Sequence, residues 1–230
     1  MIKPKAIFWD MDGTLTDSEP LWGEATYALS ERLGKRITPE IRQQTVGSTF
    51  NNTLEICARH AGVTLAPGDY EIHRQWLFRR VKDSFSSRLE VFPGVRDLLA
   101  DLKADGIQMV VATNTQRDVA DAAIDAVGRG FFADTICGDE VERGKPAPDI
   151  YEEAARRVGH SPGDCLVFED STAGMRAALD AGCVVIGLPE HGGVDVPQGV
   201  TPINRLHDSA HLAPAGARDV YAWFEKLYAV

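Results

Sequence analysis

From residue 91 onward, short apolar runs alternate with segments of helical character that are about ten residues long. The apolar runs are rich in β-favouring residues and cover 107–112, 134–137, 165–169 and 183–188. Helices are expected over 94–104, 116–127, 148–158, 172–181 and 216–228, with mostly loop over 190–213. Strands that alternate with helices form βαβ units, in which the strands run parallel and helices cover the sheet. This rhythm predicts an α/β fold with a doubly wound parallel sheet.

The amino-terminal part of the chain combines two kinds of segment. Residues 5–9 (KAIFW) form one more apolar run, which we expect to be a buried strand. Almost nothing after it alternates like a strand, and helices are expected near 18–33, 39–46, 49–62 and 69–86. We therefore predict an α/β domain of residues 1–15 and 91–230, with an inserted all-helical domain of residues 16–90. The two crossings between them, near 14–18 and 87–92, are candidate hinges.

Composition and charge exclude several classes of partner. The formal net charge of −10 argues against nucleic acid or an anionic membrane as a partner. No apolar run approaches the roughly 20 residues that span a bilayer, and the first residues do not resemble a signal peptide. The four cysteines are scattered and form no CxxC pair, which favours buried free thiols. We expect a cytoplasmic protein that is a monomer or a weak dimer.

Polar residues follow the predicted strands at the points where the strands end. They are Asp10 and Asp12, Thr113 and Asn114, Glu169 and Asp170, together with Lys145 in the loop before a helix. In open α/β sheets, ligands bind beyond the carboxyl ends of the strands. We therefore expect these residues to face one crevice.

Each of these residues also has a purely structural interpretation. The two aspartates before Gly13 suit a turn, and Thr113 or Asn114 suits the start of a helix. A single lysine is usually a solvated surface charge, and an acidic pair can cap a helix. Their occurrence at successive strand ends favours the functional interpretation over the structural ones.

Four sequence motifs appear in order along the predicted α/β domain: DMDGTLTDSEPLW, VVATNT, GKPAPDIY and VFEDSTAGMRAALDAG. Together they resemble the haloacid dehalogenase-like superfamily. The resemblance is strongest to the branch of β-phosphoglucomutase and the small sugar-phosphate phosphatases, also called CbbY-like. It implies a Rossmann-like core and a helical cap domain at the position of the insert.

The resemblance implies a phosphatase that hydrolyses a small phosphorylated metabolite, such as a sugar or polyol phosphate. Asp10 would be the nucleophile that forms an aspartyl phosphate. Asp12 would be the general acid and then the general base. Mg²⁺ would be the cofactor, because it prefers hard oxygen ligands. Its ligands would be Asp10, the backbone carbonyl of Asp12, Asp170, and Glu169 directly or through water.

The other residues of the motifs would hold the phosphate. Lys145 would neutralise Asp10 and the transferring phosphoryl group. Thr113 and the backbone amide of Asn114 would donate hydrogen bonds to phosphate oxygens. Positioning and electrostatics of this kind carry most of the catalysis of phosphoryl transfer.

In this branch the cap carries substrate selectivity, and the expected contact residues are Glu19, Gly47, Ser48 and Asn52. Asn51 and Asn52 either bind substrate hydroxyl groups or begin the helix at 53. β-Phosphoglucomutases carry a cation in this cap loop to hold a second phosphate. Here no Lys or Arg occurs between Arg42 and Arg59. The missing charge favours a phosphatase, although Arg117 could supply positive charge near the core and keeps a sugar phosphomutase as the alternative.

Two further hypotheses follow from the same scaffold. A dehalogenase would need neither a metal nor a general acid two residues after the nucleophile, so Asp12, Gly13 and Asp170 count against it. A catalytically silent binding protein would be expected to lack one of the charged residues, and none is missing.

Overall fold

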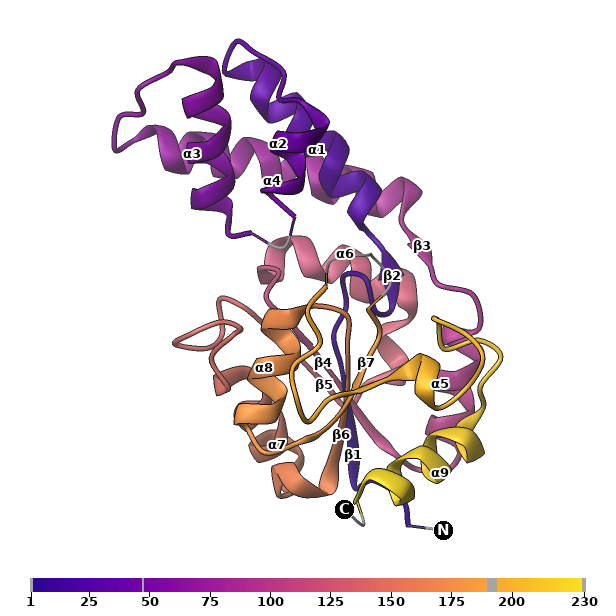
Figure 1. The fold of residues 1–230 in the computed structure, drawn as a ribbon. Helices are drawn as coiled ribbons and strands as arrows, with labels where there is room; N and C mark the ends of the chain where they lie inside the picture. Colours follow the sequence, from indigo (N-terminus) through magenta and orange to yellow (C-terminus); the bar gives the residue numbers. More distant parts are fainter. Residues whose placement is uncertain (1, 47, 190–193, 229–230) are drawn as a thin grey trace. The chain divides into compact units, whose positions relative to one another are not determined.

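The computed structural model describes residues 2–46, 48–189 and 194–228 (Figure 1). The chain divides into two compact units, Met1–Asp17 with Glu90–Val230, and Ser18–Leu89. The first unit is α/β, and the second contains helices but no strand within its described residues. A separate functional role of residues 16–90 as a cap stays a prediction.

A six-stranded parallel sheet forms the centre of the α/β unit. Its strand order is β5-β4-β1-β6-β7-β8, and every neighbouring pair is parallel. The strands are β1 (Ala6–Trp9), β4 (Gln108–Thr113), β5 (Asp134–Cys137), β6 (Cys165–Glu169), β7 (Val184–Gly187) and β8 (Thr201–Pro202). The predicted α/β fold with a parallel sheet is confirmed. The order places β1 between β4 and β6, so the ends of these three strands are adjacent.

Helices cover both faces of this sheet. They are α5 (Val95–Ala104), α6 (Arg117–Val127), α7 (Asp149–Val158), α8 (Thr172–Asp180) and α9 (Ala217–Tyr228). In Figure 1, α7 and α8 lie together on one side of the sheet and α5 and α9 on the other. Side chains alternate along a strand, so Ala6 and Phe8 pack in the cluster that contains Tyr151 of α7. Trp9 instead stacks on Phe168 at 4.5 Å between ring centroids.

The second unit is a small helical assembly with its own aromatic core. Its helices are α1 (Glu19–Arg32), α2 (Pro39–Gln43), α3 (Phe50–Ala61) and α4 (Asp69–Arg88). Trp22 of α1 meets Phe78 and Phe85 of α4 edge to face, at 6.3 and 5.9 Å between centroids. Trp22 thus has the packing of a core residue of this unit. None of the helices described in either unit has the length and apolar character needed to cross a bilayer.

Short strands occur where the sequence predicted only connections or loop. β2 (Thr16–Asp17) pairs antiparallel with β3 (Glu90–Val91). The two chain segments predicted as connections thus form a short two-stranded ribbon. β8 lies within the stretch predicted as loop and pairs with β7. A strand of two residues is too short to show the alternation on which strand prediction depends.

Gly174 provides a test of how α8 packs on β6. A Cβ at this helical position would overlap the carboxylate of Glu169. Replacing a glycine inside a helix with alanine normally stabilises the helix by up to about 1 kcal/mol. We expect the opposite for Gly174→Ala, with a loss of about 1–3 kcal/mol in the free energy of unfolding, because the core has no space.

Gly130→Ala is the matched control, since a Cβ there meets nothing within 4 Å. Urea denaturation of Gly174→Ala, Gly130→Ala and the parent protein would measure their free energies of unfolding. A Gly174→Ala protein as stable as the control would show that α8 can move away from β6.

Candidate active site

The nucleophile predicted from sequence lies in a tight turn at the end of β1. The backbone N–H of Asp10 donates to the carbonyl of Phe168 on β6, at 3.0 Å. The turn then closes on itself, with the Gly13 N–H donating to the Thr16 carbonyl at 2.9 Å. Gly13 has φ +85°, a conformation that glycine adopts readily and other residues rarely. The turn holds the Asp10 carboxyl group beside the end of β6.

Lys145 is the cationic centre of the site. Its ammonium donates to Asp10 Oδ1 at 2.6 Å, to the Ala112 carbonyl at 2.8 Å, and to Glu169 Oε1. An ammonium has three N–H donors, and all three are used. The residue is only 9% exposed. This geometry rules out the interpretation of Lys145 as a solvated surface charge.

Tyr151 is a member of the site that the sequence analysis did not identify. Its hydroxyl donates to Glu169 Oε1 at 2.6 Å, and both residues are fully buried. Glu169 therefore accepts from Lys145 and Tyr151 at the same oxygen. Tyr151 lies within the GKPAPDIY motif, but nothing in its spacing showed that the hydroxyl would reach β6.

The site carries an excess of negative charge in a buried space. Burial raises the pKa of the Asp10 carboxyl well above its usual value, and Glu169 raises it further while Lys145 lowers it. Burial also raises the pKa of Asp170, with added repulsion from Asp10 and Glu169. Burial lowers the pKa of Lys145, but Asp10 and Glu169 outweigh this and leave it raised. One ammonium is thus insufficient to balance these carboxylates.

The three carboxylates have a spacing that suits a metal ion. Asp10, Glu169 and Asp170 each offer one oxygen, and these oxygens lie within 4.8 Å of one another. A Cβ on Gly13 would overlap the Asp170 carboxylate, so glycine at this position lets Asp170 approach the turn. Hard carboxylate oxygens and unbalanced negative charge fit Mg²⁺. The residues present therefore fit the predicted cofactor.

Asp12 lies against the end of β4. Its Oδ2 accepts from the Thr115 hydroxyl at 2.7 Å and from the Thr113 hydroxyl at 3.4 Å. Thr113 Oγ1 in turn accepts the backbone N–H of Thr115 at 3.1 Å. The structure brings Asp12 and Thr113 together. Thr115 was not among the predicted site residues.

Asn114 uses its side chain to hold the loop of Lys145. Its Oδ1 accepts the Lys145 backbone N–H at 2.8 Å, and its Nδ2 donates to the Lys145 carbonyl at 3.1 Å. A Cβ on Gly144 would lie 2.8 Å from Asn114 Oδ1, so glycine there permits the close approach. From the sequence, a role was expected only for the backbone amide of Asn114.

The predicted cap residues belong to the second unit. The Glu19 carboxylate accepts from the buried Arg42 guanidinium at 2.5 Å. The Asn52 side chain donates to the Ser48 hydroxyl at 2.6 Å. Gly47 lies outside the described residues. The role of these residues in substrate binding stays a prediction.

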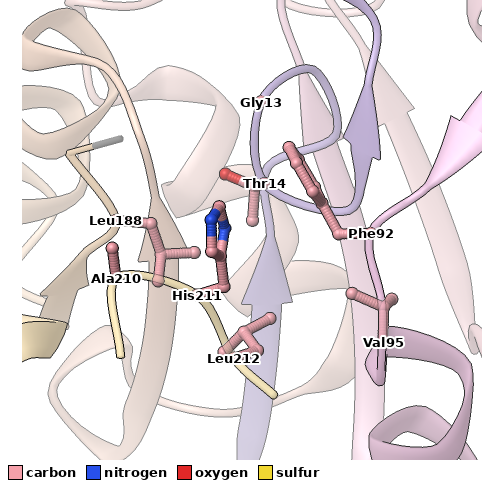
Figure 2. A pocket seen from close by; sticks show the side chains of 8 residues that line it. All are labelled: Gly13, Thr14, Phe92, Val95, Leu188, Ala210, His211 and Leu212. Atoms are coloured by element: carbon pink, nitrogen blue, oxygen red, sulfur yellow. The ribbon is translucent and has the colours of Figure 1, made fainter. Parts of the chain in front are cut away.

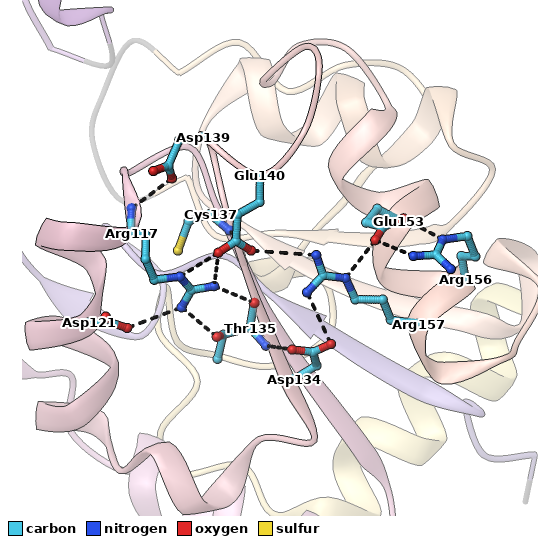
Figure 3. A network of polar contacts seen from close by, with 10 residues as sticks. All are labelled: Arg117, Asp121, Asp134, Thr135, Cys137, Asp139, Glu140, Glu153, Arg156 and Arg157. Carbon is cyan, nitrogen blue, oxygen red and sulfur yellow. Dashed lines mark hydrogen bonds and ion pairs between the residues drawn. The ribbon is translucent and has the colours of Figure 1, made fainter.

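Arg117 belongs to a polar network beside β5 (Figure 3). Its guanidinium donates to Glu140 Oε1 at 2.7 Å, to Asp121 Oδ1 at 3.3 Å, and to both the hydroxyl and the carbonyl of Thr135. Two carboxylates thus balance its charge. Arg117 therefore lacks the uncommitted positive charge that the sequence analysis considered for a second phosphate.

Thr14 packs behind the turn that carries Asp10 and Asp12. It lines a small cavity with Phe92 and His211, whose ring centroids are 5.5 Å apart (Figure 2). The cavity has about 10 Å³ of space, close to the least that one water needs. The Thr14 hydroxyl is buried without a hydrogen-bond partner among the described residues. This environment favours a packing role for Thr14.

Comparisons with known proteins agree with the fold and the motifs. Residues 4–182 match the haloacid dehalogenase-like hydrolase family, and the chain belongs to this family. A phosphorylated carbohydrates phosphatase of Thermotoga maritima is 32% identical over 179 residues, which cover 77% of this chain and 82% of the relative. Protein CbbY of Rhodobacter capsulatus is 34% identical over 195 residues, covering 80% and 85%.

A solved structure extends the similarity to nearly the whole chain. The crystal structure of CbbY from Rhodobacter sphaeroides in complex with phosphate has a TM-score of 0.78 and 28% identity. The match covers 94% of this chain and 99% of that chain. The predicted family, and the prediction that the chain is an enzyme of the hydrolase class, are confirmed.

The Asn114 side chain can be tested as a clamp on the Lys145 loop. We expect Asn114→Ala to lose both hydrogen bonds, lowering the free energy of unfolding by about 1–2 kcal/mol. Amide hydrogen exchange should also become faster in peptides that contain Lys145. Asn51→Ala, at an exposed position on α3, is the matched control. Unchanged exchange around Lys145 in Asn114→Ala would contradict the clamp.

Proposed function

We propose that this chain is a Mg²⁺-dependent phosphatase of a small phosphorylated metabolite, such as a sugar or polyol phosphate. The observation that carries the proposal is the cluster that buried Lys145 forms with Asp10, Glu169 and the partly buried Asp170 at the ends of adjacent strands. A relative that shares 32% identity is a phosphorylated carbohydrates phosphatase, which supports a sugar phosphate as the substrate.

In the proposed first step, a carboxylate oxygen of Asp10 attacks phosphorus and forms an aspartyl phosphate. The bond between phosphorus and the ester oxygen breaks, and Asp12 gives its proton to the departing alkoxide. Asp12 then takes a proton from water, whose oxygen attacks the phosphorus. Inorganic phosphate leaves, and Asp10 returns as a carboxylate.

The surrounding groups stabilise the charge that develops on the phosphoryl oxygens. Lys145 lies 2.6 Å from Asp10 and supplies a fixed positive charge. Mg²⁺, held by Asp10, Asp170 and the backbone carbonyl of Asp12, would offset the repulsion between the carboxylates and a phosphate dianion. Glu169 is engaged by Lys145 and Tyr151, which suits a contribution to the metal site through water.

A phosphatase is favoured over a phosphomutase by the distribution of positive charge. A mutase must bind two phosphates in turn and needs a second cationic site. The cap loop has no Lys or Arg between Arg42 and Arg59. Arg42 pairs with Glu19, and Arg117 pairs with Glu140 and Asp121.

Activity on a panel of sugar, polyol and nucleotide monophosphates tests the proposal. With Mg²⁺ we expect release of inorganic phosphate, and Asp10→Asn should lower turnover by about a thousandfold or more while keeping the parent circular dichroism spectrum. No phosphate from any substrate would refute the proposal. Conversion of a sugar 1-phosphate to its 6-phosphate, dependent on a bisphosphate, would instead show a phosphomutase.

Metal binding is tested without any turnover by thermal unfolding. Mg²⁺ at about 100 times its Kd should stabilise the protein by about 2.7 kcal/mol. Asp170→Asn should remove most of this stabilisation, and should not destabilise the metal-free protein, because burial and neighbouring charges already oppose ionised Asp170. Asp180 is exposed on α8, and the control variant Asp180→Asn should be stabilised by Mg²⁺ as much as the parent protein. An Asp170→Asn protein with the full response would place the metal elsewhere.

A further inference from the structure

Thr115 makes a contact that none of the predicted roles explains. Its hydroxyl donates to Oδ2 of Asp12 at 2.7 Å, a short hydrogen bond between residues 103 positions apart in sequence. Asp12 is the proposed general acid and base. We propose that Thr115 is a positioning residue that holds the Asp12 carboxyl group in the orientation needed for proton transfer. This proposal rests on the proposed function.

The backbone of Thr115 is itself held in place by two hydrogen bonds. The Thr115 N–H donates to Thr113 Oγ1 at 3.1 Å, and its carbonyl accepts the Gly138 N–H at 3.2 Å. These two hydrogen bonds thus hold the peptide groups on either side of the Thr115 Cα. The hydroxyl therefore reaches Asp12 from a constrained backbone.

Thr113 contributes less to the orientation of Asp12. Its hydroxyl lies 3.4 Å from the same Oδ2, which is longer than the range of about 2.5–3.0 Å that is usual for O–H···O hydrogen bonds. It also accepts the Thr115 N–H, so it links Thr115 to the strand. The short contact from Thr115 is accordingly the main restraint on Asp12 in this segment.

A structural role at the start of α6 does not account for the Thr115 side chain. The helix begins at Arg117 and its N-cap residue is Gln116, with no side-chain cap. The hydroxyl of Thr115 is directed to Asp12 rather than to the first N–H groups of the helix. Since a small displacement of a catalytic group can slow a reaction by orders of magnitude, fixing Asp12 would act on the chemical step.

The way in which the rate depends on the leaving group distinguishes a positioning role of Thr115 from a structural role or from phosphate binding. An alkyl phosphate releases a basic alkoxide and needs a proton from Asp12, whereas 4-nitrophenyl phosphate releases a stable phenolate and does not. We expect Thr115→Val to lower kcat/KM for a reactive alkyl phosphate by about 10- to 100-fold. For 4-nitrophenyl phosphate kcat/KM should stay within about threefold, because this ratio reports only the steps up to release of nitrophenolate and not the later hydrolysis in which Asp12 acts as base. Thr115→Ser keeps the hydroxyl and should restore kcat/KM for the alkyl phosphate.

A double variant tests whether Thr115 acts through Asp12. If it does, Thr115→Val should cause no further loss of alkyl phosphate turnover in an Asp12→Asn background, because the group that it orients is gone. Melting temperatures of all variants would separate folding from catalysis, and Thr115→Ala would replace Thr115→Val if the latter fails to fold.

Other outcomes would overturn the proposal. Equal losses of kcat/KM for both substrates would indicate a general structural role, and equal losses that arise from KM alone would make Thr115 a phosphate ligand. Parent protein that hydrolyses neither substrate, nor any other phosphate monoester in the panel, would refute the proposed function itself. Parent activity on both, with an unchanged Thr115→Val, would refute only the role of Thr115.

Discussion

The buried ammonium of Lys145 is the interaction on which the site depends. It joins Asp10 after β1, the Ala112 carbonyl on β4 and Glu169 at the end of β6. These are three adjacent strands in the interior of the sheet. Without this positive charge, the carboxylates would face one another in a space from which water is largely excluded, at a high cost in free energy. One side chain therefore stabilises both the strand ends and the arrangement that chemistry requires.

The acidic cluster also depends on two glycines in the backbone around it. Gly13 gives room to the Asp170 carboxylate, and Gly174 gives room to that of Glu169. A side chain at either glycine would push a carboxylate away from the common centre. The glycines in the DMDGT and STAGM motifs thus belong to the site, although neither has a side chain that could touch a ligand.

The sequence predicted the fold well because the alternation of strands and helices is a local signal. It also predicted that Asp10, Asp170 and Lys145 would come together, since polar residues at the ends of parallel strands share one edge. The contacts of Thr115, Tyr151 and the Asn114 side chain were missed. Each joins residues separated by 18 to 103 positions, and such pairings follow from strand order and register, which no local pattern encodes. β8 was also missed, because two residues are too few to show the alternation of apolar and polar residues by which a strand is recognised.

The enclosure of Lys145 has a consequence for its chemical reactivity. Acylating reagents attack the neutral amine, and this amine keeps its proton because Asp10 and Glu169 raise its pKa. The same two carboxylates and the Ala112 carbonyl also block approach to the nitrogen. Lys35 and Lys82 are exposed and would be acylated first. Covalent labelling of lysines would therefore report on the integrity of this pocket, since Lys145 would become modified only when the ends of the central strands separate.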